Sequence, residues 1–401
     1  MPRLDSLGLA WQINLSTGWG VFGLNLALEL ARCGTPNLRL ICPGPIEHLR
    51  AMPPWHRRAI GALECRRLTH AVPGLRFARD RAELKFGTTP DVILYALGND
   101  FTRLQVRGRA QAHRAIGVVF LENSRIAPEG LARARYYDRI IAGSHWNESV
   151  LRAQGIDHAT AVLQGVDIAL FHPRPRAGLT RERFVVFSGG ALEFRKGQDI
   201  VLAAFRAFRQ RHPEALLVTC WHTPFSERIA SIALGRHARG AVPARPDGTP
   251  DVAAWMARHD IPTDGFFDPG YVSYHNLPDL LAECDATVFP SRVEGGTNLF
   301  AMQAAASGVP TIVSANTGHL DLIERAGVSA LARQAPVAAS HLRGGETEGW
   351  GESDPEEIVE ALEAVWRRRE TAQVQALAVA KHMAAWSWRT QTEELLNAII
   401  A

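Results

Sequence analysis

The chain has 401 residues, of which 46% are hydrophobic and 21% are charged, and its net charge is +3. This length suits two soluble domains, and so small a charge favours neither a nucleic-acid coat nor a polybasic membrane anchor. The five cysteines are scattered without a Cys-x-x-Cys pair, which argues against a disulfide framework or a thiolate zinc site. Because no signal pattern or long apolar run is present, we expect a cytoplasmic protein, and a peripheral contact with the inner membrane face stays open.

Short apolar runs alternate with helical patterns in the first part of the chain. Strands are predicted over 9–15, 38–44, 91–98, 115–123, 138–144 and 159–167. The first strand leads through a glycine-containing turn into a helix predicted over 21–34, with Gly34 as its stop. Such alternation is typical of a Rossmann-like domain with a parallel sheet.

A proline-rich, charged segment over 171–183 is the best linker candidate, and the alternation restarts beyond it. Strands are predicted over 184–190, 215–220, 286–290 and 310–315, with helices over 197–213, over 277–284 and after residue 293. A polar excursion over 222–268 interrupts this half. We therefore expect an N-terminal domain over 1–172, a linker over 173–183, a C-terminal domain over 184–378 and a final helix over 379–401. The natural ligand site of two such domains is a cleft at the carboxyl ends of their sheets.

The sequence GWGVFG at 18–23 matches the G-x-G-x-x-G pattern between a strand and a helix. A dinucleotide site would also need an acidic residue at the end of the second strand, and the nearest one, Glu47, comes several residues late. NAD and FAD are therefore disfavoured. Gly18 and Gly20 can instead bring backbone N–H groups close to an anion at the helix N-terminus, or they can serve only a tight turn.

A second glycine-rich segment, SGGALEFRKGQDI at 188–200, places Gly189 and Gly190 after a predicted strand and two adjacent cations before a helix. Lys196 is one of only three lysines in a chain that has forty-one arginines. An ammonium beside the Arg195 guanidinium at a helix entrance suits a diphosphate leaving group, whose developing charge both can neutralise. A solvated basic turn explains the same residues equally well.

A third segment, VEGGTNLFAMQAAASGVP at 293–310, places Glu294 and two glycines at the head of an apolar helix. Gly295 and Gly296 allow a close backbone approach to an anion, and the helix from about Asn298 directs its N–H groups toward that turn. Glu294 would repel a bare phosphate, so it suits the hydroxyl groups of a sugar next to the phosphate; a helix-dipole role is the alternative. Gln303 lies where its amide can reach a ribose, unless it is an ordinary interhelical amide.

Two of these segments, SGGALEFRKGQDIVLAAFRAF and PSRVEGGTNLFAMQAAASGVPTIVSANTGHLDLI, resemble the retaining GT-B glycosyltransferases of family 4. The likeness extends to YDRIIAGSHWNESVL, QGVDIALFHP and DPGYVSYHNLPDLLAECDATVFPS. It is strong over about 136–325 and weaker over 1–135. The resemblance implies two Rossmann-like domains that face each other across a cleft. It also implies a C-terminal helix, here WSWRTQTEELLNAII at 386–400, that crosses back to the first domain.

The resemblance also implies roles for individual residues. Lys196, preceded by Arg195, is similar to the lysine that grips the donor diphosphate, and Glu294 is similar to the first acid of the family's paired-glutamate signature, which contacts the donor sugar. The residues expected to bind the nucleotide are Gly18, Gly20, Gly189, Gly190, Gly295, Gly296, Thr297, Asn298 and Gln303. The residues expected to act on the sugar and its leaving group are Arg195, Lys196, Glu294 and Glu122.

Three positions depart from the family pattern. Ala191 stands where an arginine is usual, and Arg195 is the expected substitute. The second glutamate of the signature is replaced: counted forward its position is Met302, and aligned backward from Ser307 of the SGVP sequence it is Gln303. An amide can still bind ribose hydroxyls. The first-domain strand that often ends near a histidine ends here in FLENSR, which leaves Glu122 and its neighbour as the polar groups expected to face the cleft.

The expected function is retaining transfer of a sugar, such as a hexose, from a nucleotide-diphosphate sugar to a glycan, lipid-linked saccharide, small molecule or protein. The family's presumed mechanism lets the leaving phosphate take the acceptor proton, so no strong general base is needed. The sequence has no Asp-x-Asp pattern for a nucleotide-bound metal, and we expect neither a metal nor another cofactor. The alternatives are an epimerase or phosphorylase on the same scaffold, a non-catalytic nucleotide-sugar-binding protein, and, less favoured, a dinucleotide oxidoreductase.

Overall fold

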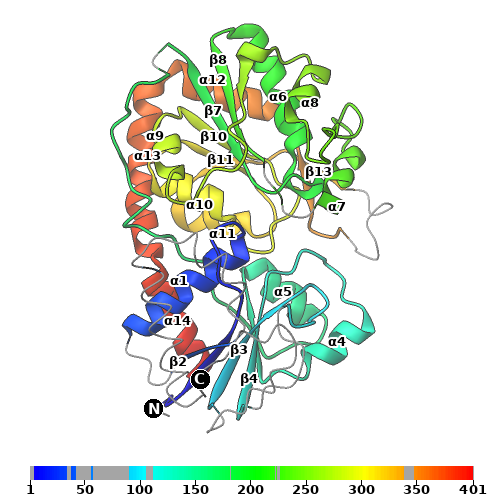
Figure 1. The fold of residues 1–401 in the computed structure, drawn as a ribbon, viewed down its shortest axis with the longest axis vertical. Coiled ribbons are helices and arrows are strands. Elements are labelled where there is room, and N and C mark those ends of the chain that lie inside the picture. The colour runs from blue at the N-terminus through cyan, green and yellow to red at the C-terminus, as the bar shows by residue number, and fades with distance from the viewer. Residues whose placement is uncertain are drawn as a thin grey trace. The chain divides into compact units, whose positions relative to one another are not determined.

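The computed structural model describes residues 4–33, 38–41, 56, 90–104, 112–180, 182–221, 223, 226–337 and 347–400. Two compact units divide the chain, and each contains a six-stranded parallel sheet (Figure 1). Unit 1 comprises Met1–Gly165 and Trp386–Ala401, and unit 2 comprises Val166–Ala385. Each unit thus has the Rossmann-like parallel sheet that the sequence predicted. In this division the segment predicted as a linker lies within unit 2, and the segment Trp386–Ala401 belongs to unit 1; the predicted domain boundaries stay predictions.

The sheet of unit 1 has the strand order β2-β1-β3-β4-β5-β6. Its strands are β1 (Leu7–Ala10), β2 (Leu38–Ile41), β3 (Val92–Leu97), β4 (Arg114–Val119), β5 (Arg139–Ala142) and β6 (Ala159–Ala161). β3 is buried along its whole length and apolar at every position, as expected for a parallel strand that is covered on both faces. All six predicted strands of this half exist, although most are shorter than predicted. The part of the predicted strand over 38–44 that follows Ile41 lies outside the described residues.

The strand predicted over 9–15 ends at Ala10, and the next seven residues form the loop into α1 (Gly18–Arg32). Asn14 explains this early end, because its Oδ1 accepts hydrogen bonds from the backbone N–H groups of Ser16 and Thr17, both at 3.0 Å. Thr17 Oγ1 in turn accepts from Gly20 N at 3.0 Å and caps the helix. A Cβ at Gly20 would lie 2.2 Å from the Asn14 side chain, so glycine permits the close approach of helix and turn.

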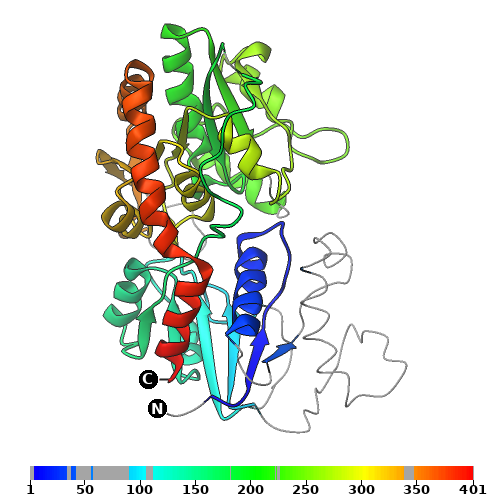
Figure 2. The same ribbon diagram turned by 90° about the vertical axis from the view of Figure 1, so that its left-hand side faces the viewer.

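Unit 1 is completed by α4 (Pro128–Ala134), α5 (His145–Ala153) and the C-terminal helix α14 (Trp388–Ile400). α14 packs against α1, as the sequence predicted; Figure 2 shows α1 alongside the strands of the sheet. The ring centroids of Phe22 and Trp388 are 5.2 Å apart, and Arg114 Nη1 donates a hydrogen bond to the Ile399 carbonyl at 2.7 Å. The last residues of the chain are therefore part of the core of unit 1.

The sheet of unit 2 has the strand order β12-β11-β10-β7-β8-β9. Its strands are β7 (Phe184–Gly189), β8 (Ala215–Cys220), β9 (Phe266–Phe267), β10 (Ala286–Phe289), β11 (Thr311–Ser314) and β12 (Ser329–Leu331). β7 and β10 are neighbours in this order, and β10 also pairs with β11. The three segments that follow these central strands at their carboxyl ends therefore come together at one edge of the sheet.

The helices of unit 2 surround this sheet (Figure 1). Those that carry or support the candidate site are η1 (Phe194–Lys196), α6 (Gln198–Arg211), α9 (Leu277–Ala282), α10 (Leu299–Ala306) and α11 (His319–Ala326). The excursion predicted over 222–268 contains, among its described residues, α7 (Ser226–Ile229), η2 (Ala230–Leu234), α8 (Val252–Arg258) and η3 (Thr263–Gly265) before β9. A small antiparallel pair, β13 (Gln334–Pro336) and β14 (Gly351–Ser353), precedes α12 (Pro355–Arg367), α13 (Arg369–Met383) and η4 (Ala384–Trp386).

Among the described residues, no helix combines the length and the apolar character that a membrane crossing requires.

Candidate active site

The loop after β10 carries the acidic residue that the sequence singled out. It runs from Pro290 to Asn298 and leads into α10, and Glu294 within it is only 4% exposed. Asn298 caps α10 from a positive φ of 63°, and its Oδ1 accepts a hydrogen bond from Ala301 N at 3.4 Å. Asparagine tolerates this backbone region better than most residues, so the sequence favours a helix start at this position.

The turn after β7 brings the predicted cations to Glu294. Lys196 Nζ lies 2.6 Å from Glu294 Oε1 and 2.7 Å from Oε2, and Arg195 Nη1 lies 3.4 Å from Oε2. Gly197 ends this turn with a positive φ of 69°, and a Cβ there would lie 2.2 Å from the Pro290 carbonyl oxygen. Glycine is therefore needed to bring the two loops together. The basic turn is not a solvated one, because Lys196 and Arg195 are largely buried.

Two neutral side chains hold Glu294 in addition to the cations. Ser291 Oγ donates a hydrogen bond to Oε1 at 2.6 Å, and Asn298 Nδ2 donates to the same oxygen at 3.0 Å. Burial would raise the pKa of Glu294, but the charges of Lys196 and Arg195 outweigh it and lower the pKa to about 2. Burial and the neighbouring Arg195 lower the pKa of Lys196 from its ordinary value, while Glu294 opposes this shift. The carboxylate is thus ionised at neutral pH, and its Oε1 is more fully occupied than its Oε2.

His319 is a member of this cluster that the sequence reasoning missed. It is the first residue of α11 and fully buried, with Nε2 at 3.2 Å from Asn298 Nδ2 and Nδ1 at 3.0 Å from Ser314 Oγ. Burial lowers the pKa of His319 to about 4, against the attraction of Glu294. A signal was present, because the segment with His319 follows β11 and the segment with Glu294 follows β10. The carboxyl ends of two paired parallel strands must lie side by side.

Arg292 is the second residue that the sequence reasoning missed, and it connects the loop after β10 with the turn after β7. Its side chain is fully buried; Nη1 and Nη2 contact the two carboxylate oxygens of Asp199 at 2.8 Å, and Nε contacts Glu352 at 2.6 Å. Nη1 also donates to the Phe194 carbonyl at 2.7 Å, and the backbone N–H donates to the Arg195 carbonyl at 2.7 Å. Arg292 therefore fixes the turn that presents Arg195 and Lys196.

The other predicted nucleotide-binding residues of unit 2 lie around this cluster. Gly189 ends β7 and packs closely on Phe300 of α10, and Gly190 lies against the aliphatic stem of Lys196. Gly295, Gly296 and Thr297 belong to the buried loop before α10. Gln303 is 5% exposed, and no residue in the described part of the chain hydrogen-bonds its side-chain amide. Gly189 and Gly190 thus have a packing role, whether or not they also contact a ligand.

The predicted residues of unit 1 form no charged cluster with one another. Gly18 is the first residue of α1 and exposed, whereas Gly20 is buried against the Asn14 turn. Glu122 follows β4, is partly exposed, and its backbone N–H donates to Asn99 Oδ1 at 3.2 Å. Gly18 and Glu122 thus both lie beyond the carboxyl ends of strands in the unit 1 sheet, at the edge where parallel-sheet proteins bind ligands. Their roles stay predictions.

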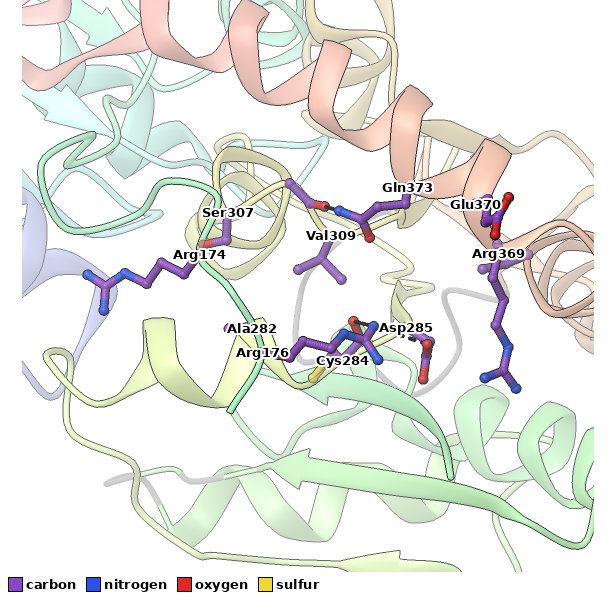
Figure 3. Close-up of a pocket in the computed structure, with 12 residues that line it drawn as sticks. Arg174, Arg176, Ala282, Cys284, Asp285, Ser307, Val309, Arg369, Glu370 and Gln373 are labelled. Carbon is purple, nitrogen blue, oxygen red and sulfur yellow. Dashed lines mark hydrogen bonds and ion pairs between the residues drawn. The ribbon is translucent and has the colours of Figure 1, made fainter. Parts of the chain in front are cut away.

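A cavity of about 560 Å³ lies elsewhere in unit 2, lined by Arg174, Arg176, Ser307, Val309, Arg369 and Gln373 among others. Figure 3 shows that the Arg174 and Arg369 side chains point away from one another, while Arg176 contacts Asp285 at 3.0 Å. The arginines therefore do not converge on one point, and no residue of the Lys196–Glu294 cluster lines this cavity. Across the described residues, no group of three or more His, Cys, Asp or Glu side chains is arranged to hold a metal ion.

Solved structures of similar fold cover nearly the whole chain. Sucrose-phosphate synthase from Thermosynechococcus elongatus is similar with a TM-score of 0.65 and 13% identity, covering 98% of each chain. HepE from Anabaena in complex with UDP has a TM-score of 0.61 and 14% identity, over 98% of this chain and 99% of HepE. The lipopolysaccharide outer core galactosyltransferase WaaB has a TM-score of 0.56 and 13% identity, over 98% of each chain. The fold is therefore GT-B.

The sequence also matches a family model over part of its length. Residues 272–395 match the model of the family described as "Family 4 Glycosyltransferase in conflict systems". This segment includes Glu294, Asn298 and His319, and the match confirms the resemblance to family 4 glycosyltransferases. No curated protein matches the chain significantly.

Proposed function

We propose that the protein is a retaining, metal-independent glycosyltransferase that moves a sugar from a nucleotide-diphosphate sugar to an acceptor. The observation that carries the proposal is the buried ion pair of Lys196 and Glu294, at 2.6 Å, between the head of α10 and the turn after β7. Buried charges are costly unless they are paired, and neutral residues of similar size would stabilise the fold as well. The presence of these charges at the carboxyl edge of the sheet is explained by a ligand that interacts with both of them.

The two charges suit the two ends of a sugar diphosphate. Lys196 and Arg195 can neutralise the charge that develops on the departing diphosphate, and the amides before α10 can add hydrogen bonds to it. Glu294 can accept hydrogen bonds from sugar hydroxyls, because it is ionised at neutral pH. The leaving phosphate can then take the acceptor proton, which requires no general base from the chain. Glu122 of unit 1 is our candidate for positioning the sugar or the acceptor, which can be a carbohydrate, a lipid-linked saccharide, a small molecule or a protein.

UDP-glucose is the first donor to test, because HepE, which shares the fold, has been crystallised with UDP and with UDP-glucose. We expect one nucleotide sugar in a panel to raise the unfolding temperature of the protein. A donor present at 100 times its Kd stabilises the fold by about 2.7 kcal/mol. The same donor should release its nucleoside diphosphate when a suitable acceptor is added. Binding without release in any acceptor mixture would instead indicate a non-catalytic nucleotide-sugar-binding protein, and turnover of the donor without any acceptor would indicate an epimerase.

Lys196→Met is the decisive variant, and Lys381→Met is its control on the exposed face of α13. We expect Lys196→Met to abolish stabilisation by the donor and to lower kcat/KM by roughly 10²–10³-fold, as for the loss of one group that stabilises developing charge. Lys381→Met should retain both properties. If the two variants bind and turn over the donor equally well, the proposed role of Lys196 is wrong.

A further inference from the structure

The hydrogen bonds of His319 can be assigned unambiguously from its neighbours. Asn298 Nδ2 lies 3.0 Å from Glu294 Oε1, and an ionised carboxylate can only accept, so this atom of Asn298 is the donating nitrogen. The same nitrogen lies 3.2 Å from His319 Nε2, which must therefore accept its second hydrogen. The proton of the neutral imidazole is then on Nδ1, which faces Ser314 Oγ at 3.0 Å.

The chain of donors continues to the backbone and leaves no member unsatisfied. Ser314 Oγ accepts from His319 and donates to the Ser291 carbonyl at 2.6 Å, while Asn298 Oδ1 accepts from Ala301 N. Every hydrogen bond in the series has one donor and one acceptor, so the series permits a single arrangement. Asn298 is thus held in one orientation by Ala301, by Glu294 and by His319, which accepts the second hydrogen of the Asn298 amide nitrogen.

We propose that His319 is a positioning residue that, through Asn298, anchors Oε1 of Glu294 and leaves Oε2 for a hydroxyl of the donor sugar. The inference rests on the proposed function. Oε1 accepts from Ser291, Asn298 and Lys196 at 2.6 to 3.0 Å, whereas among the described residues Oε2 accepts from Lys196 and Arg195 alone. Both cations are the groups assigned to the diphosphate, so their movement toward a bound donor frees Oε2 and not Oε1. Without His319 the Asn298 amide loses one of its three hydrogen bonds, and Asn298 holds the carboxylate oxygen less firmly.

Two variants separate this role from a general packing role. In His319→Gln the terminal amide oxygen can occupy the place of Nε2 and accept from Asn298. In His319→Asn the shorter amide reaches only the place of Nδ1 and preserves the contact with Ser314. Each variant keeps one of the two hydrogen bonds of the imidazole, so comparable losses of thermal stability are expected for both.

The readout is the affinity gained from the sugar, measured as the ratio of the Kd of the nucleoside diphosphate to that of the nucleotide sugar. UDP and UDP-glucose are the first probes, followed by the pair that stabilises the unmodified protein most. We expect His319→Asn to lower this ratio about tenfold and His319→Gln to leave it within about twofold, with the Kd of the nucleoside diphosphate unchanged in both. In a Glu294→Gln background, His319→Asn should have no further effect on the ratio, because His319 acts through Glu294.

The outcomes separate the two proposals. If the unmodified protein binds and transfers a sugar but His319→Asn and His319→Gln give equal ratios, the inference about His319 is overturned and the proposed function stands. An undiminished effect of His319→Asn in the Glu294→Gln background also overturns it. If the unmodified protein binds no nucleotide of the panel, the proposed function fails, and the positioning role fails with it.

Discussion

The turn that carries Lys196 in unit 2 and the loop that carries Gly18 in unit 1 hold the same place in similar sheets, but they are stabilised differently. Each follows a buried parallel strand and leads into a helix. The loop of unit 1 is held by neutral groups, such as the Thr17 cap and the Trp11 indole, whose Nε1 donates to the Trp19 carbonyl at 2.7 Å. The turn of unit 2 is held by buried charges.

This difference supports the proposal that the turn of unit 2 binds a ligand. Packing alone accounts for Gly20, because its Cβ would collide with Asn14. Packing does not account for Lys196, Arg195 and Glu294, because paired buried charges contribute little to net stability. If this is so, removing buried charges should disturb the site of unit 2, and crowding the packed glycine should disturb the loop of unit 1.

The largest effect is expected for Arg292→Met. This change removes the guanidinium between Asp199 and Glu352; Asp199 loses its buried ion pair, while Glu352 still contacts Arg236. Breaking a buried pair on one side typically costs about 3–5 kcal/mol, and chemical denaturation should show a loss of that size. Arg333→Met is the control, because Arg333 is exposed and pairs with Asp354 on the surface, where such pairs contribute less than about 1 kcal/mol. Equal losses in the two variants would contradict an organising role for the buried pair.

The sequence predicted the fold better than it predicted the site. Apolar runs with helical patterns between them determine parallel sheets, so the two halves and the return of the last helix to unit 1 could be predicted. The early end of β1 at Ala10 could not be predicted, because the Asn14 side chain forms a local turn that interrupts the strand pattern. Lys196 and Glu294 stand out by their residue types beside glycines. Arg292 and His319 do not stand out by residue type, because the chain has forty-one arginines and His319 is one histidine at a helix start; the only signal for His319 is that its segment follows the strand paired with β10.

The next largest effect is the loss of folding stability at acidic pH. Burial lowers the pKa of His319 from its ordinary value of 6.5 to about 4, with Glu294 and Lys196 as the charged groups that face it. The unfolded chain therefore binds the extra proton between these values, so this contribution to stability is complete above about pH 6.5 and is lost as the pH falls toward 4. A shift of this size corresponds to about 3 kcal/mol in total.

The measurement is the free energy of unfolding against pH for the unmodified protein and for His319→Gln. We expect the unmodified protein to lose more stability between pH 6.5 and 4 than the variant, because only the former has the titrating imidazole at this position. His259, whose pKa burial also lowers to about 4, is present in both proteins, so its contribution cancels in the difference. Parallel curves would show that His319 is not held neutral by the fold.

A smaller effect is expected in unit 1 for Gly20→Ala. The added Cβ would overlap the Asn14 side chain, which must move and give up part of the turn before α1. Crowding of this kind typically costs about 1–3 kcal/mol, and thermal unfolding should show it. Gly18→Ala is the matched control at the exposed start of the same helix, where alanine is the better helix former and stability should not fall.

Gly18→Ala also sharpens the comparison of the two segments. If the unit 1 loop only packs, the variant should bind a nucleoside diphosphate as tightly as the unmodified protein does. A weaker Kd with unchanged stability would show instead that the N–H groups at this helix start approach the ligand. That result would give the loop of unit 1 a function alongside the charged turn of unit 2.

The smallest effect is expected for Gln303→Glu, which introduces the acid that the resemblance to family 4 implies at this position when the sequence is aligned backward from Ser307. The side chain is buried on α10, and within the described residues its amide has no hydrogen-bond partner. A carboxylate there costs stability in the empty protein, because it is desolvated without a partner. With a ribose in place it can accept charge-assisted hydrogen bonds, so the Kd for the nucleotide should change by about tenfold, which is about 1.4 kcal/mol.

Gln373→Glu on α13 is the matched control, since Gln373 donates to the Gly308 carbonyl away from the Lys196–Glu294 cluster. It should lower stability slightly and leave the Kd for the nucleotide unchanged. If Gln303→Glu changes neither affinity nor the preferred base, Gln303 does not occupy the ribose position. The charged organisation of unit 2 would then end at the head of α10, with Glu294 and Asn298, and the ribose would have to be held by another part of the protein.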